Sequence, residues 1–117
     1  MSKSLADLAV EFWKLLNNYD RFIDVVPDIA KPRLAAQARF GKTRLATILQ
    51  NEGMHLTVYD GHVFEPNLPV VAINDDEFAS SDVLVISQTI EPTILQQLNV
   101  INVGKVYLAK SVSPRGL

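Results

Sequence analysis

The strongest constraint on this chain is an apolar stripe that begins near its N-terminus. Large apolar residues recur there at alternating steps of three and four, the spacing of helices packed in a bundle: Leu5, Leu8, Phe12, Leu15, Tyr19, Phe22 and Val26. Leu16 and Ile23 lie beside the stripe and widen it. The pattern predicts a bundle helix over residues 4–26, with Ser4 as its N-cap and Pro27 ending it.

A second helix is predicted after the proline-containing turn at residues 27–32. A proline suits the first position of a helix, and a glycine suits the left-handed backbone that ends one. The second helix is therefore expected from Pro32 to Glu52, followed by Gly53. Its stripe repeats the spacing of the first: Leu34, Ala38, Gly41, Leu45 and Ile48. Ala38 and Gly41 are small and predict a close approach by another helix.

Two helices cannot bury this much apolar surface against each other, because each covers only one face of its neighbour. Burying one large apolar side chain stabilises a fold by about 1.5 to 3 kcal/mol, so leaving several exposed would remove most of a small domain's stability. The rest of the chain could cover the remaining face, or two hairpins could form a four-helix bundle, which the heptad spacing favours. A homodimer is predicted, with this interface: Leu5, Leu8, Phe12, Leu15, Tyr19, Phe22, Ala38, Gly41, Leu45 and Ile48.

The period of the apolar residues changes to two after the second helix, which indicates short strands. Strand residues Leu56, Val58 and Val63 flank Asp60-Gly61, the preferred two-residue turn of a β-hairpin. Further strands are predicted at three places, separated by an acidic loop and by a stretch broken at Pro92: residues 68–73, 83–88 and 100–110.

The predicted fold class is therefore α+β. Residues 1–53 form a helical dimerisation region, residues 54–110 a small antiparallel β domain of five or six strands, and residues 111–117 a disordered tail. A chain of 117 residues with 48% hydrophobic content is one small globular unit, and a core split between two such parts gains from oligomerisation.

Composition argues against several classes of partner and chemistry. The net charge is −2, and the 11 Lys and Arg residues are scattered, so no basic run follows a phosphate backbone. The absence of cysteine excludes disulfides, thiol catalysis and thiolate metal sites. The N-terminus leads directly into a charged amphipathic pattern, which fits neither a signal peptide nor a membrane span. We expect a cytoplasmic protein with neither nucleic acid nor a membrane as a partner.

Two motifs could suggest catalysis or nucleotide binding. Gly41-Lys42-Thr43 matches only the end of a Walker A loop and lies within a helical pattern instead of following a strand. The serines Ser80, Ser81 and Ser87 have no nearby histidine and no nucleophile-elbow glycines. No enzyme is predicted.

Two further groups could suggest a metal. His55 and His62 flank the predicted hairpin turn, but Asp60 does not complete a tetrahedral set with them. Asp75-Asp76-Glu77 lacks the ordered spacing of a calcium loop. No metal or other cofactor is predicted.

The β half also contains a four-residue motif in a distinctive setting. Phe64-Glu65-Pro66-Asn67 precedes the apolar strand Val70-Val71-Ala72-Ile73. Val83-Leu84-Val85-Ile86-Ser87-Gln88 and a closing strand over residues 103–110 follow. In this order, and with the helix over residues 5–26, these segments resemble the C-terminal region of the GrpE family, the nucleotide-exchange factors of DnaK-type chaperones, whose signature is Phe-Asp-Pro-Asn.

The resemblance implies a GrpE-like head: a homodimer held by a four-helix bundle, which presents a β wing to the ATPase domain of a DnaK-type chaperone or a related ATPase. The wing would favour the open nucleotide cleft of that domain, so that nucleotide leaves without any cofactor or catalytic residue. The implied partner-binding residues come from the matched motifs and from the loop that follows them: Glu65, Asn67, Gln88, Glu91 and Gln96.

Departures from the family pattern leave other functions open. Thr89-Ile90-Glu91-Pro92 stands where the family has Lys-Gly-Tyr, and the family's Arg-Pro-Ala is replaced near Ile101-Asn102-Val103. Only Met1-Ser2-Lys3 precede the first predicted helix, so we expect the family's long coiled-coil arm to be lacking. The second hypothesis is a dimeric adaptor of the same fold that serves another partner without exchange activity. The third is a small ligand-binding protein or enzyme with a site between helices and sheet.

Overall fold

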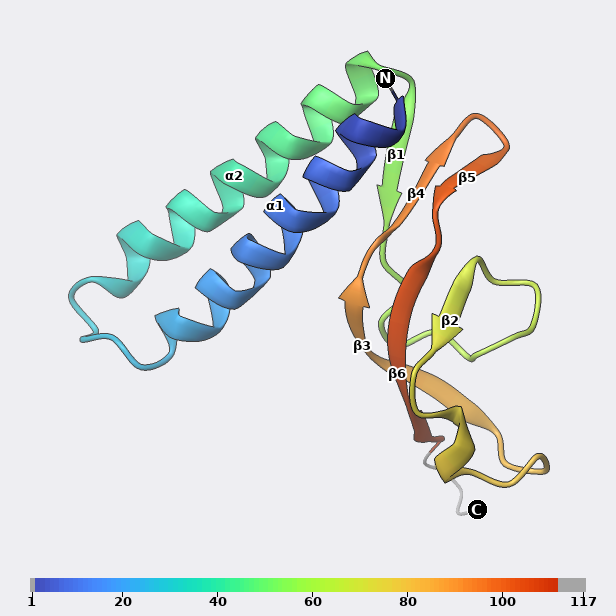
Figure 1. The fold of residues 1–117 in the computed structure, drawn as a ribbon. Coiled ribbons are helices and arrows are strands. Elements are labelled where there is room, and N and C mark those ends of the chain that lie inside the picture. The colour runs from blue at the N-terminus through green and yellow to red at the C-terminus, as the bar shows by residue number, and fades with distance from the viewer. Residues whose placement is uncertain (1, 112–117) are drawn as a thin grey trace.

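A computed structural model describes residues 2–111 (Figure 1). Two helices are followed by six strands and a short 3-10 helix: α1 (Ser2–Ile23), α2 (Lys31–Asn51), β1 (Met54–Thr57), β2 (Val70–Ala72), η1 (Asp75–Glu77), β3 (Leu84–Glu91), β4 (Thr93–Gln96), β5 (Asn99–Asn102) and β6 (Gly104–Lys110). The predicted α+β class is confirmed. The predicted tail lies outside the described residues except for Ser111, whose N–H donates to the Val83 carbonyl at 2.9 Å.

Both helices lie close to their predicted ranges, with corrections at the ends of α1. Ser4 lies inside α1 and is not its N-cap, because the helix already begins at Ser2. The helix ends at Ile23, before Val26, since bonds of the tighter i→i−3 type replace the α-helical ones there and the residue before a proline avoids helical backbone. Gly53 follows α2 with a φ of 75°, the predicted left-handed stop.

The two helices pack antiparallel (Figure 1). Gly41 lies against Leu16 of α1, and a Cβ at residue 41 would lie 3.0 Å from Leu16 Cδ2. Ala38 is also buried. The predicted close approach at these small residues is confirmed, but the approaching helix belongs to the same chain.

The β half forms two three-stranded sheets. We name them the helix-side sheet, with strand order β1-β4-β5, and the wing sheet, with strand order β2-β6-β3. The helix-side sheet is antiparallel throughout, whereas β2 runs parallel to β6 in the wing sheet. The prediction of a wholly antiparallel β domain is therefore wrong for β2, because the alternation of apolar residues identifies strands without specifying their partners.

The predicted hairpin around Asp60-Gly61 is also wrong, although its turn forms. The His62 N–H donates to the Tyr59 carbonyl at 2.9 Å, and Gly61 has a φ of 87°. β1 nevertheless pairs with β4, and Val63 forms a bridge with Val85 of β3. The turn therefore redirects the chain from the helix-side sheet to the edge of the wing sheet.

The chain changes sheets again at Pro92 and at Val103. Pro92 lies between β3 of the wing sheet and β4 of the helix-side sheet, where its lack of an N–H costs no ladder bond. The stretch that follows this proline contains β4, a strand that the sequence analysis did not predict. The single strand predicted over residues 100–110 divides at Val103, because β5 belongs to the helix-side sheet and β6 to the wing sheet.

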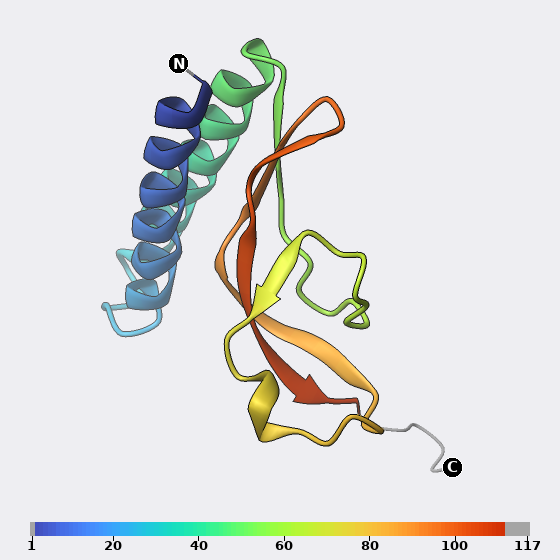
Figure 2. The same ribbon diagram turned by 45° about the vertical axis from the view of Figure 1, so that its right-hand side comes forward.

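Each sheet has its own core. The first core joins the N-terminal part of α1 and the C-terminal part of α2 to the helix-side sheet: Ala6, Ala9, Val10, Leu45, Leu49, Met54 and Ile94. The second core lies on one face of the wing sheet, where Phe64 and Phe78 pack against Ile86, Val106 and Leu108. The helices thus cover the helix-side sheet, and the wing sheet extends beyond them (Figure 2).

The two sheets join where Gly104 passes Thr93. The Pro69 carbonyl accepts two hydrogen bonds there, from the Gly104 N–H at 3.1 Å and from Thr93 Oγ1 at 2.9 Å. Both residues are buried. Pro69 thus connects the segment before β2 with β4 and β6 at once.

Gly104→Ala is expected to lower the free energy of unfolding by about 1–3 kcal/mol, measured by chemical denaturation. An added Cβ would lie 2.6 Å from Thr93 Oγ1 and 3.1 Å from the Glu91 carbonyl oxygen. Val103→Ala, at the exposed neighbour, serves as the control and should change stability by less than about 0.5 kcal/mol. If Gly104→Ala left the free energy of unfolding unchanged, the close crossing of β4 and β6 would be contradicted.

Candidate functional site

The outer face of the helical pair is apolar and is not covered by the rest of the described chain, residues 2–111. We name it the outer helical face and define it by large apolar residues that are 37–71% exposed: Leu8, Phe12, Leu15 and Phe22 of α1 with Phe40 and Ile48 of α2. The steps between the α1 residues place them on one side of that helix. Single apolar residues are common on protein surfaces, but a contiguous group of this size marks an interaction site.

A groove runs between the two helices on this face. It encloses about 360 Å³ and is lined chiefly by apolar side chains: Phe12, Leu16, Tyr19, Ala38, Phe40 and Gly41. Tyr19 Oη donates to Gln37 Oε1 at 3.0 Å. The groove is large enough for an aromatic or leucine side chain from a second helix.

The predicted dimer interface divides between this face and the interior. Leu8, Phe12, Leu15, Phe22 and Ile48 belong to the outer helical face, and Tyr19 and Gly41 line its groove. Ala38 and Leu45 are buried within one chain, although Ala38 also lines the groove, and Leu5 packs against the first core, so these three residues already have neighbours in their own chain. A heptad pattern does not distinguish a neighbour in the same chain from one in another.

Phe40 was missed, although it is 71% exposed. It lies outside the alternating steps of three and four that were followed along α2. A large aromatic residue at a helix position away from the intramolecular stripe is the signal that would have identified it.

The predicted partner-binding residues do not share one surface. Glu65 and Asn67 are exposed in the loop before β2, on the side of the wing sheet away from the helices (Figure 1). Gln96 belongs to the helix-side sheet, and its Nε2 donates to the Glu52 carbonyl at 3.1 Å. Only Gln88 and Glu91 lie on the same strand, β3.

The motif Phe64-Glu65-Pro66-Asn67 has a clear structural role. Phe64 packs against the second core, and its N–H donates to the Leu84 carbonyl at 2.8 Å. The Leu68 N–H donates to the Glu65 carbonyl at 3.1 Å, which closes a turn over Pro66 and Asn67. The motif therefore anchors the loop before β2 to the wing sheet.

Glu91 connects α1 to the wing sheet. Its carboxylate accepts a hydrogen bond from Lys14 Nζ at 3.2 Å and lies 3.9 Å from Lys105 Nζ, while its side chain is only 18% exposed. Lys14 also lies 3.5 Å from Glu11. The hydrogen bond to Glu91 raises the pKa of Lys14, because it stabilises the charged form.

A cleft opens between α1 and β3 beyond this contact. It encloses about 170 Å³ and is lined from both sides by mainly polar residues: Lys14, Asn17, Asn18 and Arg21 of α1 with Gln88, Thr89 and Ile90 of β3. We name it the helix–wing cleft. Its α1 residues have the spacing i, i+3, i+4 and i+7 of one helix face, a polar stripe that the sequence contains and that was overlooked.

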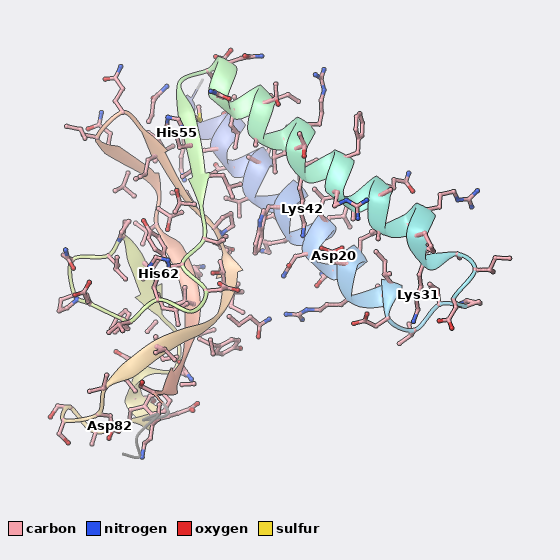
Figure 3. All side chains as sticks on the ribbon, turned by 180° about the vertical axis from the view of Figure 1, so that it is seen from behind. Asp20, Lys31, Lys42, His55, His62 and Asp82 are labelled. Atoms are coloured by element: carbon pink, nitrogen blue, oxygen red, sulfur yellow. The ribbon has the colours of Figure 1, made fainter. Side chains whose placement is uncertain are left out.

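The remaining motifs form no site in the described part of the chain. Gly41-Lys42-Thr43 lies inside α2, where Lys42 is paired with Asp20. Figure 3 shows His55 on β1 well apart from His62 in the turn beyond that strand. Between residues 2 and 111 there is no group of three or more His, Asp or Glu side chains that could hold a metal ion.

Comparison with protein-family models, with characterised proteins and with solved structures finds no match for this chain. Neither helix of the described chain has the length and apolarity needed to cross a bilayer. The features of the structure that bear on function are therefore the outer helical face and the wing sheet.

Lys14→Gln is expected to lower the free energy of unfolding by up to about 1 kcal/mol near neutral pH, because it removes the cation from Glu91. The folded pKa of Lys14 is raised, so this contribution is complete below the ordinary lysine pKa of 10.5 and is lost as the pH rises through the folded pKa.

Denaturation of both proteins from neutral to alkaline pH measures the difference. Lys3→Gln is the control, since Lys3 pairs with Asp7 at an exposed site within α1 and should contribute only about 0.3–0.5 kcal/mol. A Lys14→Gln effect that persisted unchanged at strongly alkaline pH would exclude the charge as its cause.

Proposed function

We propose that the protein is a dimeric co-chaperone of the GrpE kind, which binds the ATPase domain of a DnaK-type chaperone or a related ATPase and promotes nucleotide release. The observation that carries this proposal is the outer helical face beside a projecting wing sheet. The order of helices and strands agrees with what the sequence resemblance implies. The groove suits a second copy, and the wing suits a protein partner.

The exposed apolar surface supports the dimer. Monomeric soluble proteins rarely expose contiguous apolar patches larger than a few hundred Å². A twofold axis beside the outer helical face would pair each helical hairpin with its copy and form a four-helix bundle. In such a bundle Phe40 of one copy is a suitable occupant of the groove of the other, since both lie on the same face.

The proposed mechanism is conformational. A protein that binds the open form of an ATPase domain more tightly than the closed form shifts the domain towards the open form, and nucleotide leaves. This role needs a wing in a defined position, not an acid, a base or a ligand. The first core and the Lys14–Glu91 contact both hold the helices against the β half, which suits such a role.

An adaptor of the same fold without exchange activity is the second candidate. The observation that favours it is the structural use of the segment that departs from the family, residues 89–92. Thr89 and Pro92 are buried, and the Thr89 hydroxyl is hydrogen-bonded to Asp60. A segment so closely integrated in this wing could present a surface to a different partner.

The third candidate, a small enzyme or ligand-binding protein, receives less support. The helix–wing cleft encloses about 170 Å³, below the roughly 300–1,000 Å³ of small-molecule sites. A larger hollow of about 570 Å³ at the far end of the wing lies within that range, but most of its lining is apolar and its polar side chains are few: Asp75, Ser80 and Asp82. Asp82 already accepts a hydrogen bond from the Ala79 N–H at 3.0 Å.

Leu15→Asp is expected to convert the proposed dimer to a folded monomer, because it places an unpaired charge in the bundle core. Leu15 is 64% exposed in a single chain, so the monomer should keep its helical circular dichroism. Light scattering at micromolar concentration measures the mass. Thr43→Asp, at an exposed position of α2, is the control and should leave the mass unchanged. If the wild-type protein were a monomer at every micromolar concentration measured, the four-helix bundle would be refuted.

Adding the protein to a DnaK-type chaperone loaded with fluorescent nucleotide is expected to accelerate release. Typical coupling free energies correspond to a weakening of nucleotide affinity by about 5- to 150-fold. Thr43→Asp should retain this effect. If no chaperone of this type released nucleotide faster, the exchange activity would be excluded, and the adaptor function would be favoured.

A further inference from the structure

We propose that the helix–wing cleft binds an acidic segment of the protein partner, with Arg21 as its principal anchor. This inference rests on the proposed function, because it assumes a protein partner and names the chemistry by which that partner is recognised. The cleft brings together residues of α1 and β3 that are distant in the sequence.

The charges around the cleft leave Arg21 unmatched. Lys14 and Lys105 both lie within 4 Å of Glu91, and Lys14 also approaches Glu11, so these carboxylates already have cations. Among the described residues no salt bridge includes Arg21, although it lines the cleft. A guanidinium in this position can bind an incoming carboxylate through two parallel hydrogen bonds.

Amide side chains extend the donor surface on both walls. Asn17 and Asn18 line the cleft one turn before Arg21, and Gln88 lines it from β3. Each amide group supplies N–H donors that can bind carboxylate or backbone carbonyl oxygens. The set is suited to a peptide, which offers acceptors along its whole length.

The surface beside the cleft favours a peptide over other anions. Lys105 and Tyr107 alternate with the buried Val106 and Leu108, so they share the face of the wing sheet opposite the second core. Tyr107 is 40% exposed, and Ile90 lines the cleft itself. This mixture of apolar and basic groups matches a segment with both apolar and acidic side chains. A nucleic acid backbone requires many cations, so the net charge of −2 and the single unmatched guanidinium of the cleft oppose it as the ligand.

Binding of a fluorescein-labelled peptide in which glutamates alternate with serine and leucine tests the proposal. Fluorescence polarisation at low salt should show saturable binding that is lost at high salt, while a matched peptide with glutamine for glutamate should bind at least about tenfold more weakly. Arg21→Glu should weaken binding of the acidic peptide by a similar factor. Arg39→Glu is the matched control on the exposed surface of α2 and should have little effect.

Three results would overturn the proposal: no binding of the acidic peptide, an equal loss in the Arg21→Glu and Arg39→Glu proteins, or equally tight binding of a single-stranded oligonucleotide with the same dependence on Arg21. Nucleotide release by the chaperone separates this inference from the proposed function. Release that is accelerated equally by wild-type and Arg21→Glu proteins would refute the cleft alone. Peptide binding at Arg21 without accelerated release would refute the exchange activity alone.

Discussion

Helix α1 has three neighbouring environments, and the remainder of the structure depends on how its sequence is divided among them. One side packs against α2 through Leu16, and Ala6, Ala9 and Val10 are buried in the first core, which α1 shares with α2 and the helix-side sheet. The third side carries Leu8, Leu15 and Phe22, which remain exposed. An apolar side chain stabilises a fold only when it is removed from water. The exposed residues of the third side therefore contribute little to the stability of a single chain, and burying them would add to it. This imbalance is the physical reason for proposing a second copy.

The side of α1 that faces the β half changes in character along the helix. Val10 and Trp13 contribute to the first core, whereas Asn17 and Arg21 line a cleft. The change occurs at Lys14, which reaches Glu91 of β3. Apolar residues therefore attach the helices to one sheet, and polar residues keep the other sheet apart from them. The result is an open cleft next to the Lys14–Glu91 contact.

The sequence predicts the elements of this fold better than it predicts their partners. Apolar period, prolines and Gly53 located both helices to within a few residues, because these signals are local. The parallel pairing of β2 with β6 and the changes of sheet at Pro92 and Val103 depend on contacts between distant segments, which alternation does not encode. For the same reason the apolar stripe found Leu8 and Leu15 but also included Ala38 and Leu45, which are internal. The helix–wing cleft required the structure, since its two walls are more than sixty residues apart.

Helix α1 takes part both in the proposed dimer and in the proposed recognition of an acidic segment. Its outer side would form the bundle and its inner side one wall of the cleft, so a segment bound at Arg21 would contact both the dimerisation helix and the wing strand β3. Such a segment can bind tightly only if the two walls keep a defined separation, because loss of rigidity adds an entropic cost to binding. The first core and the Lys14–Glu91 contact limit that separation from one end of the cleft. A bundle that stiffened α1 would limit it further, which makes dimerisation and partner binding mutually supportive in this fold.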